Sequence, residues 1–269
     1  MTDADFAFFV RAARDHAGIA LAPGKRTMLA GRLNKVVRER GCGSFSRYAE
    51  QLRAGDADDV REFVDAITTN LTSFFRERHH FDHLRDHALP ALLAARQRVG
   101  RLRLWSAGCS SGEEAYSMAM VLHEALGPAS WDARILATDI DDTVLERAAR
   151  AVYQAERLAD VPERYRQIGF QRGGGASRGL VRIRPAVAAR VAVRRLNLME
   201  AWPMRRDYDI IFCRNVAIYF DKPTQRQLID RFADLLADDG LLFIGHSETL
   251  FQVSERFAPL GRTIYRKVA

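Results

Sequence analysis

Two glutamates follow a glycine turn, and their position gives the first indication of chemistry in the chain. The stretch 102–117 reads LRLWSAGCSSGEEAYS, in which Gly108 and Gly112 enclose a run of small residues. A small-residue turn lets a ligand approach the backbone, and a helix that begins after it offers free N–H groups. Glu113 and Glu114 at that helix start would repel a dinucleotide pyrophosphate but would tolerate an amine or a sulfonium. The stretch therefore favours S-adenosylmethionine (SAM) over NAD, unless the two glutamates only complement the helix dipole.

A further acidic residue follows the next apolar run. The residues 134–138 predict a buried strand, and Asp139 comes at its end. The separation from the glycine turn, about 25 residues, is close to that expected for an acid that binds ribose hydroxyls. Asp141 is expected to cap the helix that follows. These acids do not predict a metal site, because no other ligands lie nearby in the sequence.

A third candidate region is the polar and aromatic segment TTNLTSFFRE, residues 68–77. A plain linker would hardly use adjacent phenylalanines, here Phe74 and Phe75, so the segment is expected to have a function. The alternative is a helix capped by Thr72 or Ser73.

Polar residues also follow two later apolar runs. The residues 208–213 and 241–245 predict strands, and the side chains that follow them are Arg214, Asn215 and Val216 in the first case and His246, Ser247 and Glu248 in the second. The carboxyl ends of parallel strands share one edge of a sheet, where ligands bind. We interpret Cys213 as a core residue and His246 as a turn residue that shapes the pocket.

The elements that carry these residues predict a helical part followed by an α/β part. Four stretches within the first seventy residues show helical spacing and no strand signal, which predicts a small all-helical domain. After residue 100, strands alternate with helices, and this order predicts a doubly wound sheet. The expected divisions are an N-terminal domain over 1–72, a linker and helix over 73–100, and the sheet domain over 101–269. Glycines and short alternating runs predict a β-hairpin subdomain inserted at about 158–188, which is either a partner-binding element or a flexible surface loop.

Composition narrows the class of protein. The chain has 269 residues, of which 48% are apolar, and no apolar run long enough to span a membrane. Its acidic start does not resemble a secretory signal. Three separate cysteines (Cys42, Cys109 and Cys213) fit a reduced cytoplasm better than a disulfide framework. The net charge of +7 permits an acidic partner, for which nucleic acid is the usual first hypothesis.

Basic residues gather on the second predicted helix, about 26–40. Arg32, Lys35 and Arg38 fall on one face beside its apolar stripe. Such a face would suit an acidic helix or a phosphate backbone, although a solvated face is the simpler interpretation.

Five stretches together resemble a known family. They are TTNLTSFFRE (68–77), SAGCSSGEEAYS (106–117), ATDID (137–141), FCRNVAIYFDK (212–222) and GHSE (245–248). In this order along the chain they resemble the chemotaxis receptor methyltransferases, the CheR family. Ala115 stands where proline is expected and Ala217 where a larger apolar residue is usual, and neither departure affects a polar site residue.

The resemblance implies a SAM-dependent protein-glutamate O-methyltransferase that acts on the cytoplasmic helices of chemoreceptors. It implies a Rossmann-like SAM-methyltransferase sheet, an all-α N-terminal domain and an inserted antiparallel β-subdomain. The cofactor contacts that it implies are Asn70, Thr72 and Arg76 in the linker, Glu113 or (preferably) Glu114 at the glycine turn, Asp139 at the ribose, and Asn197, Leu198, Asn215 and Val216 along the adenosine and methionine. Arg76, Arg214 and Tyr219 would lie closest to the transferred methyl group.

The same resemblance gives the basic helix and the insert a use. Receptor methylation regions are acidic helices, so Arg32, Lys35 and Arg38 would guide the substrate to the cleft. The insert resembles a subdomain that, in some members of the family, holds a short tail at the receptor's C-terminus, and the loop GGGASRG is compatible with that class. We expect a cytoplasmic monomer that meets membranes only through receptors and binds neither nucleic acid nor a metal.

The chemistry of this reaction fits the residues present. The pKa of a free glutamate carboxyl is about 4.3, so the acceptor is already ionised at neutral pH and no general base is needed. The reaction needs alignment of the reactants and exclusion of water, which explains the lack of a Ser-His-Asp or Cys-His set.

Three other functions remain as alternatives. A SAM methyltransferase for nucleic acid or a small molecule would fit the positive charge, but the chain has no Asn/Asp-Pro-Pro-Tyr motif. A non-enzymatic module that binds SAM or its product S-adenosylhomocysteine (SAH) would keep Asp139 and lose Arg76 or Tyr219, and all three are present. An NAD dehydrogenase is the weakest alternative, because the glycine spacing is wrong for it.

Overall fold

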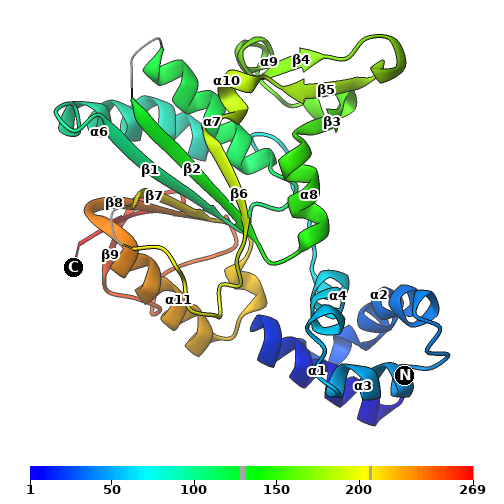
Figure 1. Cartoon of the computed structure of the whole chain (residues 1–269). Coiled ribbons are helices and arrows are strands. Elements are labelled where there is room, and N and C mark those ends of the chain that lie inside the picture. Colours follow the sequence, from blue (N-terminus) through cyan, green and yellow to red (C-terminus); the bar gives the residue numbers. More distant parts are fainter. Residues whose placement is uncertain (128–130, 206–207, 269) are drawn as a thin grey trace.

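The N-terminal part of the chain is a bundle of four helices. The computed structural model describes residues 1–127, 131–205 and 208–268. The bundle comprises α1 (Asp3–Ala17), α2 (Arg26–Glu39), α3 (Phe45–Arg53) and α4 (Ala57–Ile67), with a 3-10 turn at Pro23–Lys25. In Figure 1 it lies at the end of the molecule away from α6 and α7. The prediction of an all-helical beginning is confirmed.

Capping residues set the ends of these helices. Thr2 and Asp5 form a capping box at the start of α1, and Gly18 ends the helix in the left-handed conformation at φ 69°. Ser44 caps α3 and Asp56 caps α4 through backbone N–H groups. In the centre of the bundle the buried ring of Phe9 stacks on the rings of Tyr48 and Phe63, which are also buried.

A seven-stranded sheet forms the centre of the larger part. Its strands are β1 (Arg101–Ala107), β2 (Asp132–Asp139), β6 (Val191–Arg195), β7 (Tyr208–Cys213), β8 (Leu236–Ile244), β9 (Phe257–Gly261) and β10 (Ile264–Lys267), in the spatial order β6-β2-β1-β7-β8-β10-β9. The first five in this order pair in parallel, and β10 and β9 add an antiparallel edge. The doubly wound sheet is therefore confirmed.

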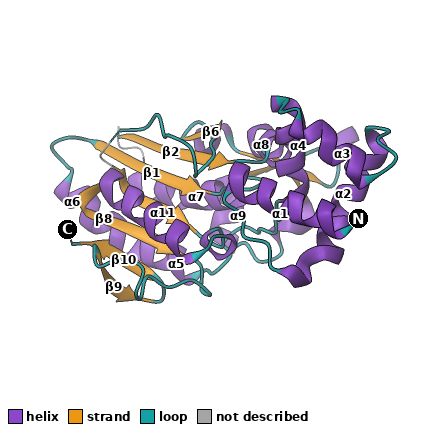
Figure 2. Ribbon diagram, turned by 90° about the horizontal axis from the view of Figure 1, so that it is seen from below, coloured by secondary structure: helices purple, strands orange, loops and turns teal. Residues whose placement is uncertain are grey.

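Helices cover both faces of this sheet (Figures 1 and 2). They are α5 (His79–His83), a π turn at Leu84–Ala88, α6 (Leu89–Ala95), α7 (Glu113–Leu126), α8 (Asp142–Arg150) and α11 (Lys222–Leu235). Alternate residues of each strand enter different cores. Leu104 of β1 packs in the core that includes α5 to α7, whereas its neighbour Trp105 packs with Phe232 of α11 on the other face.

The inserted subdomain has one more strand than the sequence analysis predicts. It is a small antiparallel sheet in the order β3-β5-β4, formed by β3 (Val152–Gln154), β4 (Phe170–Arg172) and β5 (Leu180–Ile183). A 3-10 turn (Ala155–Leu158), α9 (Glu163–Gly169), a 3-10 turn at Gly175–Ser177 and α10 (Pro185–Ala188) complete it. The predicted hairpin corresponds to β4 and β5, and the prediction missed β3 because three residues are too few to show a period of two.

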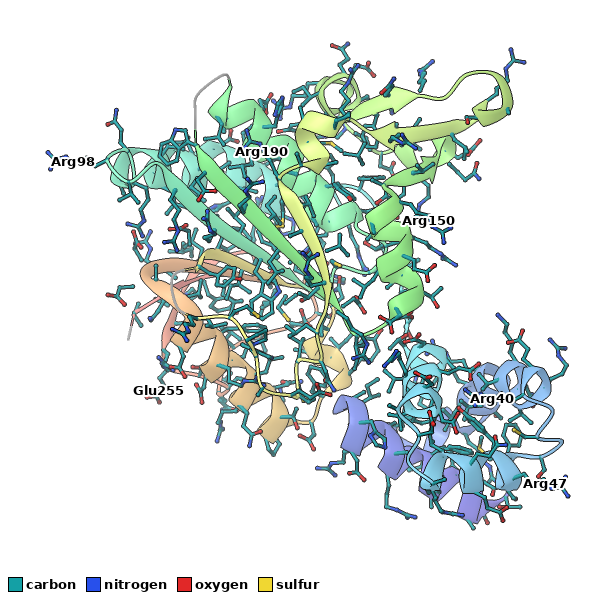
Figure 3. The ribbon with its side chains drawn as sticks, in the orientation of Figure 1. Arg40, Arg47, Arg98, Arg150, Arg190 and Glu255 are labelled. Atoms are coloured by element: carbon teal, nitrogen blue, oxygen red, sulfur yellow. The ribbon has the colours of Figure 1, made fainter. Side chains whose placement is uncertain are left out.

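Basic side chains are spread over the surface. Arg47, Arg98 and Arg150 project from three different regions of the chain in Figure 3, so the positive net charge is not gathered on one element. No described helix is long and apolar enough to cross a membrane.

Candidate active site

A pocket lies at the carboxyl ends of β1, β2 and β7, where the order of the sheet reverses. β1 pairs with β2 on one side and with β7 on the other, and this switch point is where open α/β sheets bind ligands. The predicted site residues that line the pocket are Asn70, Thr72, Arg76, Glu114, Asp139, Asn197, Leu198, Arg214, Asn215, Val216 and Tyr219. Glu113 is the one predicted cofactor contact that does not line it.

The glycine turn needs its glycines for two reasons. Gly108 has φ 93°, and a Cβ atom there would lie 2.4 Å from Cγ2 of Val216. Gly112 is the N-cap of α7 at φ 96° and is enclosed by Ala148, Tyr116 and Tyr153. A side chain at either position would be strained and crowded.

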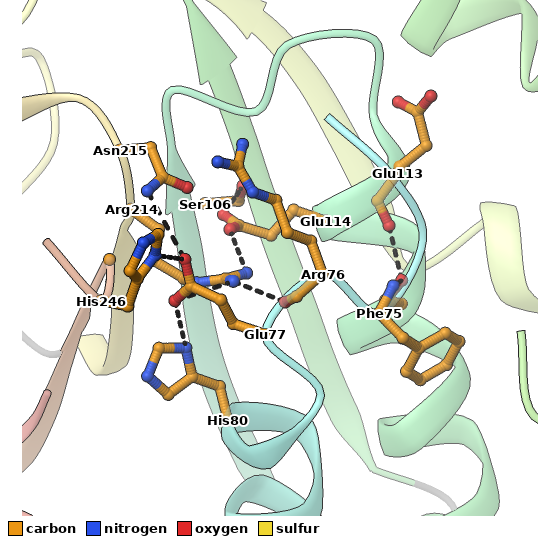
Figure 4. Close-up of polar contacts among 12 residues, drawn as sticks. Phe75, Arg76, Glu77, His80, Ser106, Glu113, Glu114, Arg214, Asn215 and His246 are labelled. Atoms are coloured by element: carbon orange, nitrogen blue, oxygen red, sulfur yellow. Dashed lines mark hydrogen bonds and ion pairs between the residues drawn. The ribbon is translucent and has the colours of Figure 1, made fainter. Parts of the chain in front are cut away.

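The two glutamates after the turn point in different directions (Figure 4). Glu114 is buried, accepts a hydrogen bond from Ser106 Oγ at 2.7 Å and pairs with Arg214 Nη1 at 3.0 Å. Burial raises the pKa of the Glu114 carboxyl, although the Arg214 charge opposes the shift. Glu113 instead bonds to Ser111 and pairs with Arg157 of the insert. This geometry favours Glu114 as the residue that faces a ligand.

Asp139 is held by the backbone at the pocket wall. Its carboxylate accepts hydrogen bonds from the N–H groups of Ser110 and Ile140 at 2.8 Å and of Asp141 at 3.1 Å. Burial raises the pKa of the Asp139 carboxyl, and these N–H groups oppose that shift. The side chain is therefore fixed in place before any ligand arrives.

The linker 68–77 is an irregular segment rather than a helix, which excludes the alternative of a helix capped by Thr72 or Ser73. Asp141 Oδ2 accepts from Thr68 Oγ1 at 2.8 Å and from Asn70 Nδ2 at 2.6 Å, while its Oδ1 caps α8. Ser110 Oγ donates to the Asn70 carbonyl at 3.2 Å. Asp141 is therefore a cap, as predicted, and it also ties the linker to the end of β2.

Arg214 and Glu77 form the centre of a buried ionic network at the pocket (Figure 4). Glu77 Oε2 lies 3.3 Å from Arg214 Nη2, and Glu77 Oε1 lies 2.9 Å from His246 Nδ1. Arg214 Nη2 also donates to the Arg76 carbonyl. Burial acts to raise the pKa of Glu77, but the hydrogen bond from His246 and the Arg214 charge prevail and lower it to about 2.

Another carboxylate fixes the loop that follows β7. Glu248 accepts hydrogen bonds from the N–H groups of Asn215 at 2.9 Å, Val216 at 3.1 Å and Ile218 at 3.2 Å. Asn215 adopts the left-handed conformation at φ 59°. Phe75, Glu77 and Ser110 do so as well, and such backbone is common at functional sites.

The N-terminal bundle closes one side of the pocket. Asn197 Nδ2 donates to the His16 carbonyl at 2.7 Å, and the Ala20 N–H donates to the Tyr219 carbonyl at 2.8 Å. Arg14 pairs with Asp221 at 2.6 Å. Asn197 and Tyr219 are thus positioned by contacts that the order of the chain does not reveal.

The three basic residues of α2 differ in their surroundings. Arg32 is partly buried and donates to the carbonyl groups of Ile67 and Thr68, so it holds the start of the linker. Lys35 is exposed, with its Nζ 3.9 Å from Glu39 Oε1, and Arg38 is also exposed. Lys35 and Arg38 are therefore the members of the set that face solvent.

Sequence reasoning did not assign Glu77 and Glu248 to the site. Both occur inside the quoted motifs, at the ends of TTNLTSFFRE and GHSE. Their positions, shortly after a strand or an aromatic pair, are the signal in the sequence that could have assigned these carboxylates to the site. The sequence does not show which atoms they bind, because those atoms belong to distant segments.

Two domain models of one family match nearly the whole chain. Residues 4–68 match the CheR methyltransferase all-alpha domain, and residues 70–266 match the CheR methyltransferase SAM binding domain.

The chain belongs to the CheR methyltransferase family.

Relatives agree over nearly the full length. A chemotaxis protein methyltransferase of Klebsiella aerogenes is 43% identical over 98% of this chain and 90% of its own. Chemotaxis protein methyltransferase 2 of Pseudomonas aeruginosa is 44% identical over 92% of this chain and 87% of its own. A probable chemotaxis protein methyltransferase of Rhizobium etli is 42% identical over 93% of this chain and 94% of its own.

Proposed function

We propose that this CheR family member transfers the methyl group of SAM to glutamate carboxylates on the cytoplasmic helices of chemoreceptors. The observation that carries the proposal is the pocket at the switch point, because eleven site residues predicted from the sequence line this one pocket. Relatives named as chemotaxis protein methyltransferases over nearly the whole chain support the same activity.

The polar and charged groups of the pocket suit the chemical groups of SAM. Asp139 offers a carboxylate to ribose hydroxyls, and Glu114 offers negative charge beside the glycine turn. The Nε atom of Arg214 is buried and has no hydrogen-bond partner among the described residues, which leaves a donor for a ligand or a water molecule. When bound, SAM supplies an electrophilic methyl group and a neutral leaving group.

Two side chains are proposed to act on the reactants directly. Arg76 lines the pocket and, within the described chain, uses only Nη1 in a hydrogen bond, to the Leu71 carbonyl at 2.7 Å. Its remaining N–H groups are suited to orient an acceptor carboxylate. Tyr219 also lines the pocket, and its hydroxyl would align either reactant.

Arg214 is proposed to act mainly by position. Its guanidinium is shared among Glu114, Glu77 and the Arg76 carbonyl, so it fixes the backbone that presents Arg76. Cys213 is buried, and burial raises the pKa of its thiol, which agrees with a core role rather than a nucleophilic one.

Receptor docking is proposed at two surfaces. Lys35 and Arg38 on α2 are exposed and would attract an acidic methylation helix. In the insert, a groove would accept a receptor tail. The basic side chains that line this groove are those of Arg166, Arg172, Arg178 and Arg184. A pulldown with a receptor-tail peptide tests the second surface, and absence of binding would remove it.

The test of the activity is transfer of radiolabelled methyl groups from SAM to membranes rich in chemoreceptors, followed by mild alkali. We expect label on the receptor band that is released as volatile methanol, which identifies a carboxyl methyl ester. Label that resists alkali would contradict the proposed acceptor. SAM binding without any transfer, across a panel of receptors, would favour a sensor over an enzyme.

A further inference from the structure

The inserted subdomain reaches the border of the cofactor pocket through Arg157. This residue lies in the 3-10 turn Ala155–Leu158, which follows β3. Its Nη2 donates to the Thr72 carbonyl at 2.9 Å and also pairs with the Glu113 carboxylate. One guanidinium therefore joins the linker, where Thr72 lines the pocket, to the first turn of α7.

Aromatic contacts hold the same junction together. The centre of the Phe74 ring in the linker lies 4.9 Å from the ring centre of Tyr153 and 5.1 Å from the ring centre of Phe170. Both of these partners belong to the insert. The Tyr153 hydroxyl donates to the Ser111 carbonyl in the glycine turn at 2.7 Å. The insert thus contacts both the linker and the glycine turn that enclose the pocket.

Arg157 stabilises both of its partners, the Glu113 carboxylate and the linker at Thr72. The Glu113 side chain is only 1% exposed, and a buried carboxylate that loses its counter-charge is strongly disfavoured. The linker contains Phe75 and Glu77 in the left-handed conformation at φ 55°. Backbone in this conformation persists only where surrounding contacts hold it. The contact of Arg157 with the Thr72 carbonyl therefore helps to keep the linker in the conformation that forms the pocket.

We propose that Arg157 is a positioning residue of the cofactor pocket, which it stabilises by clamping the Thr72 carbonyl to Glu113. Neither Arg157 nor Glu113 is among the pocket-lining residues of the described chain, so both act through their neighbours. The inference rests on the proposal that this pocket holds SAM. It also gives Glu113 a different role from the direct cofactor contact that its place in the motif implies.

The first test compares SAM binding by calorimetry in the full chain and in Arg157→Gln. Without the clamp, the binding-competent linker is less populated, and the apparent affinity falls by the same factor. We expect the dissociation constant to rise about tenfold, because a hydrogen bond to a charged group is lost. We also expect KM for SAM to rise with little change in kcat, since Arg76 and Tyr219 are untouched.

Arg164→Gln is the matched control. Arg164 lies in α9 of the same insert, is exposed, and has its guanidinium 4.8 Å from the centre of the Tyr165 ring. We expect SAM affinity close to that of the unmodified chain. An equal loss in Arg164→Gln would show that any loosening of the insert weakens binding, and the specific role of Arg157 would be overturned.

A double-mutant comparison separates positioning from direct contact. Glu113→Gln should weaken SAM binding as Arg157→Gln does, and the double variant should be no weaker than either alone, because both changes remove one clamp. A further loss in the double variant would mean that Glu113 touches SAM itself, which overturns the inference. Unchanged affinity in Arg157→Gln overturns it as well. Unchanged affinity in Asp139→Asn would instead refute the proposed cofactor site.

Discussion

Glu77 is the residue whose replacement most sharply tests the ionic network at the pocket. Its carboxylate binds Arg214, His246 and, at 3.5 Å, the Asn215 amide. Glu77→Gln keeps the size of the side chain and removes its charge. Arg214 would then keep Glu114 as its carboxylate partner, and we expect the fold to lose stability at neutral pH.

The magnitude follows from the lowered pKa of Glu77. Its value falls from 4.5 to about 2, and each unit corresponds to about 1.4 kcal/mol, so the ionised side chain contributes at most about 3 kcal/mol. A depressed pKa of an acid gives stability that is present above pH 4.5 and lost as the pH falls through about 2. For a chain of this size the loss at neutral pH corresponds to a decrease in Tm of roughly 8 °C.

The assay is thermal unfolding of both proteins at several values of pH between 7 and 3. We expect the difference in Tm to be largest at pH 7 and to shrink by about half at pH 3, because Glu77 of the unfolded chain takes up a proton below pH 4.5 while Glu77 of the folded chain stays ionised until about pH 2. Glu163→Gln is the control, because Glu163 is 71% exposed and contacts Arg166 at 3.5 Å, so its loss should change stability by no more than about 0.5 kcal/mol. A difference that is absent at pH 7, or that is the same at every pH, would refute the role assigned to Glu77.

Three further predictions concern separate parts of the molecule. Burial and the neighbouring Asp141 raise the pKa of Asp65 from 3.8 to about 7, so the unmodified protein loses stability as the pH rises through this range. Asp65→Asn should therefore stabilise the fold by about 1 kcal/mol at pH 8 and not at pH 4. Equal changes in Tm at the two pH values would contradict this prediction. Gly108→Ala should weaken SAM binding at least about tenfold in calorimetry, because its φ is 93° and its Cβ would collide with a neighbour; unchanged affinity would show that the turn adapts. The double change Lys35→Glu and Arg38→Glu should lower receptor methylation at low salt with SAM affinity unchanged; if methylation persists in full at low salt, this face does not dock the receptor.

Most of the pocket could be predicted from the sequence because parallel strands expose their carboxyl ends at one edge. Asp139 and Asn215 follow apolar runs, and the fold brings both runs into a single sheet. The choice between Glu113 and Glu114 could not be made from helical spacing. It depends on Arg214, which pairs with Glu114, and on Arg157, which pairs with Glu113.

Two features of the structure could not be predicted from the sequence alone. Arg32 shares a helical face with Lys35, yet it turns back to bind the carbonyl groups at the end of α4. The third strand of the insert was missed because Val152–Gln154 shows no alternation. In both cases the partner that decides the structure lies far along the chain.

The most direct test of the account is a crystal structure of the full chain with SAH. The account predicts electron density in the pocket at the switch point, with the ribose hydroxyls against Asp139 and the sulfur atom near Arg76, Arg214 and Tyr219. Glu113 should remain paired with Arg157, away from the ligand. Density at another place, or a ligand held by Glu113 with Asp139 left free, would contradict it.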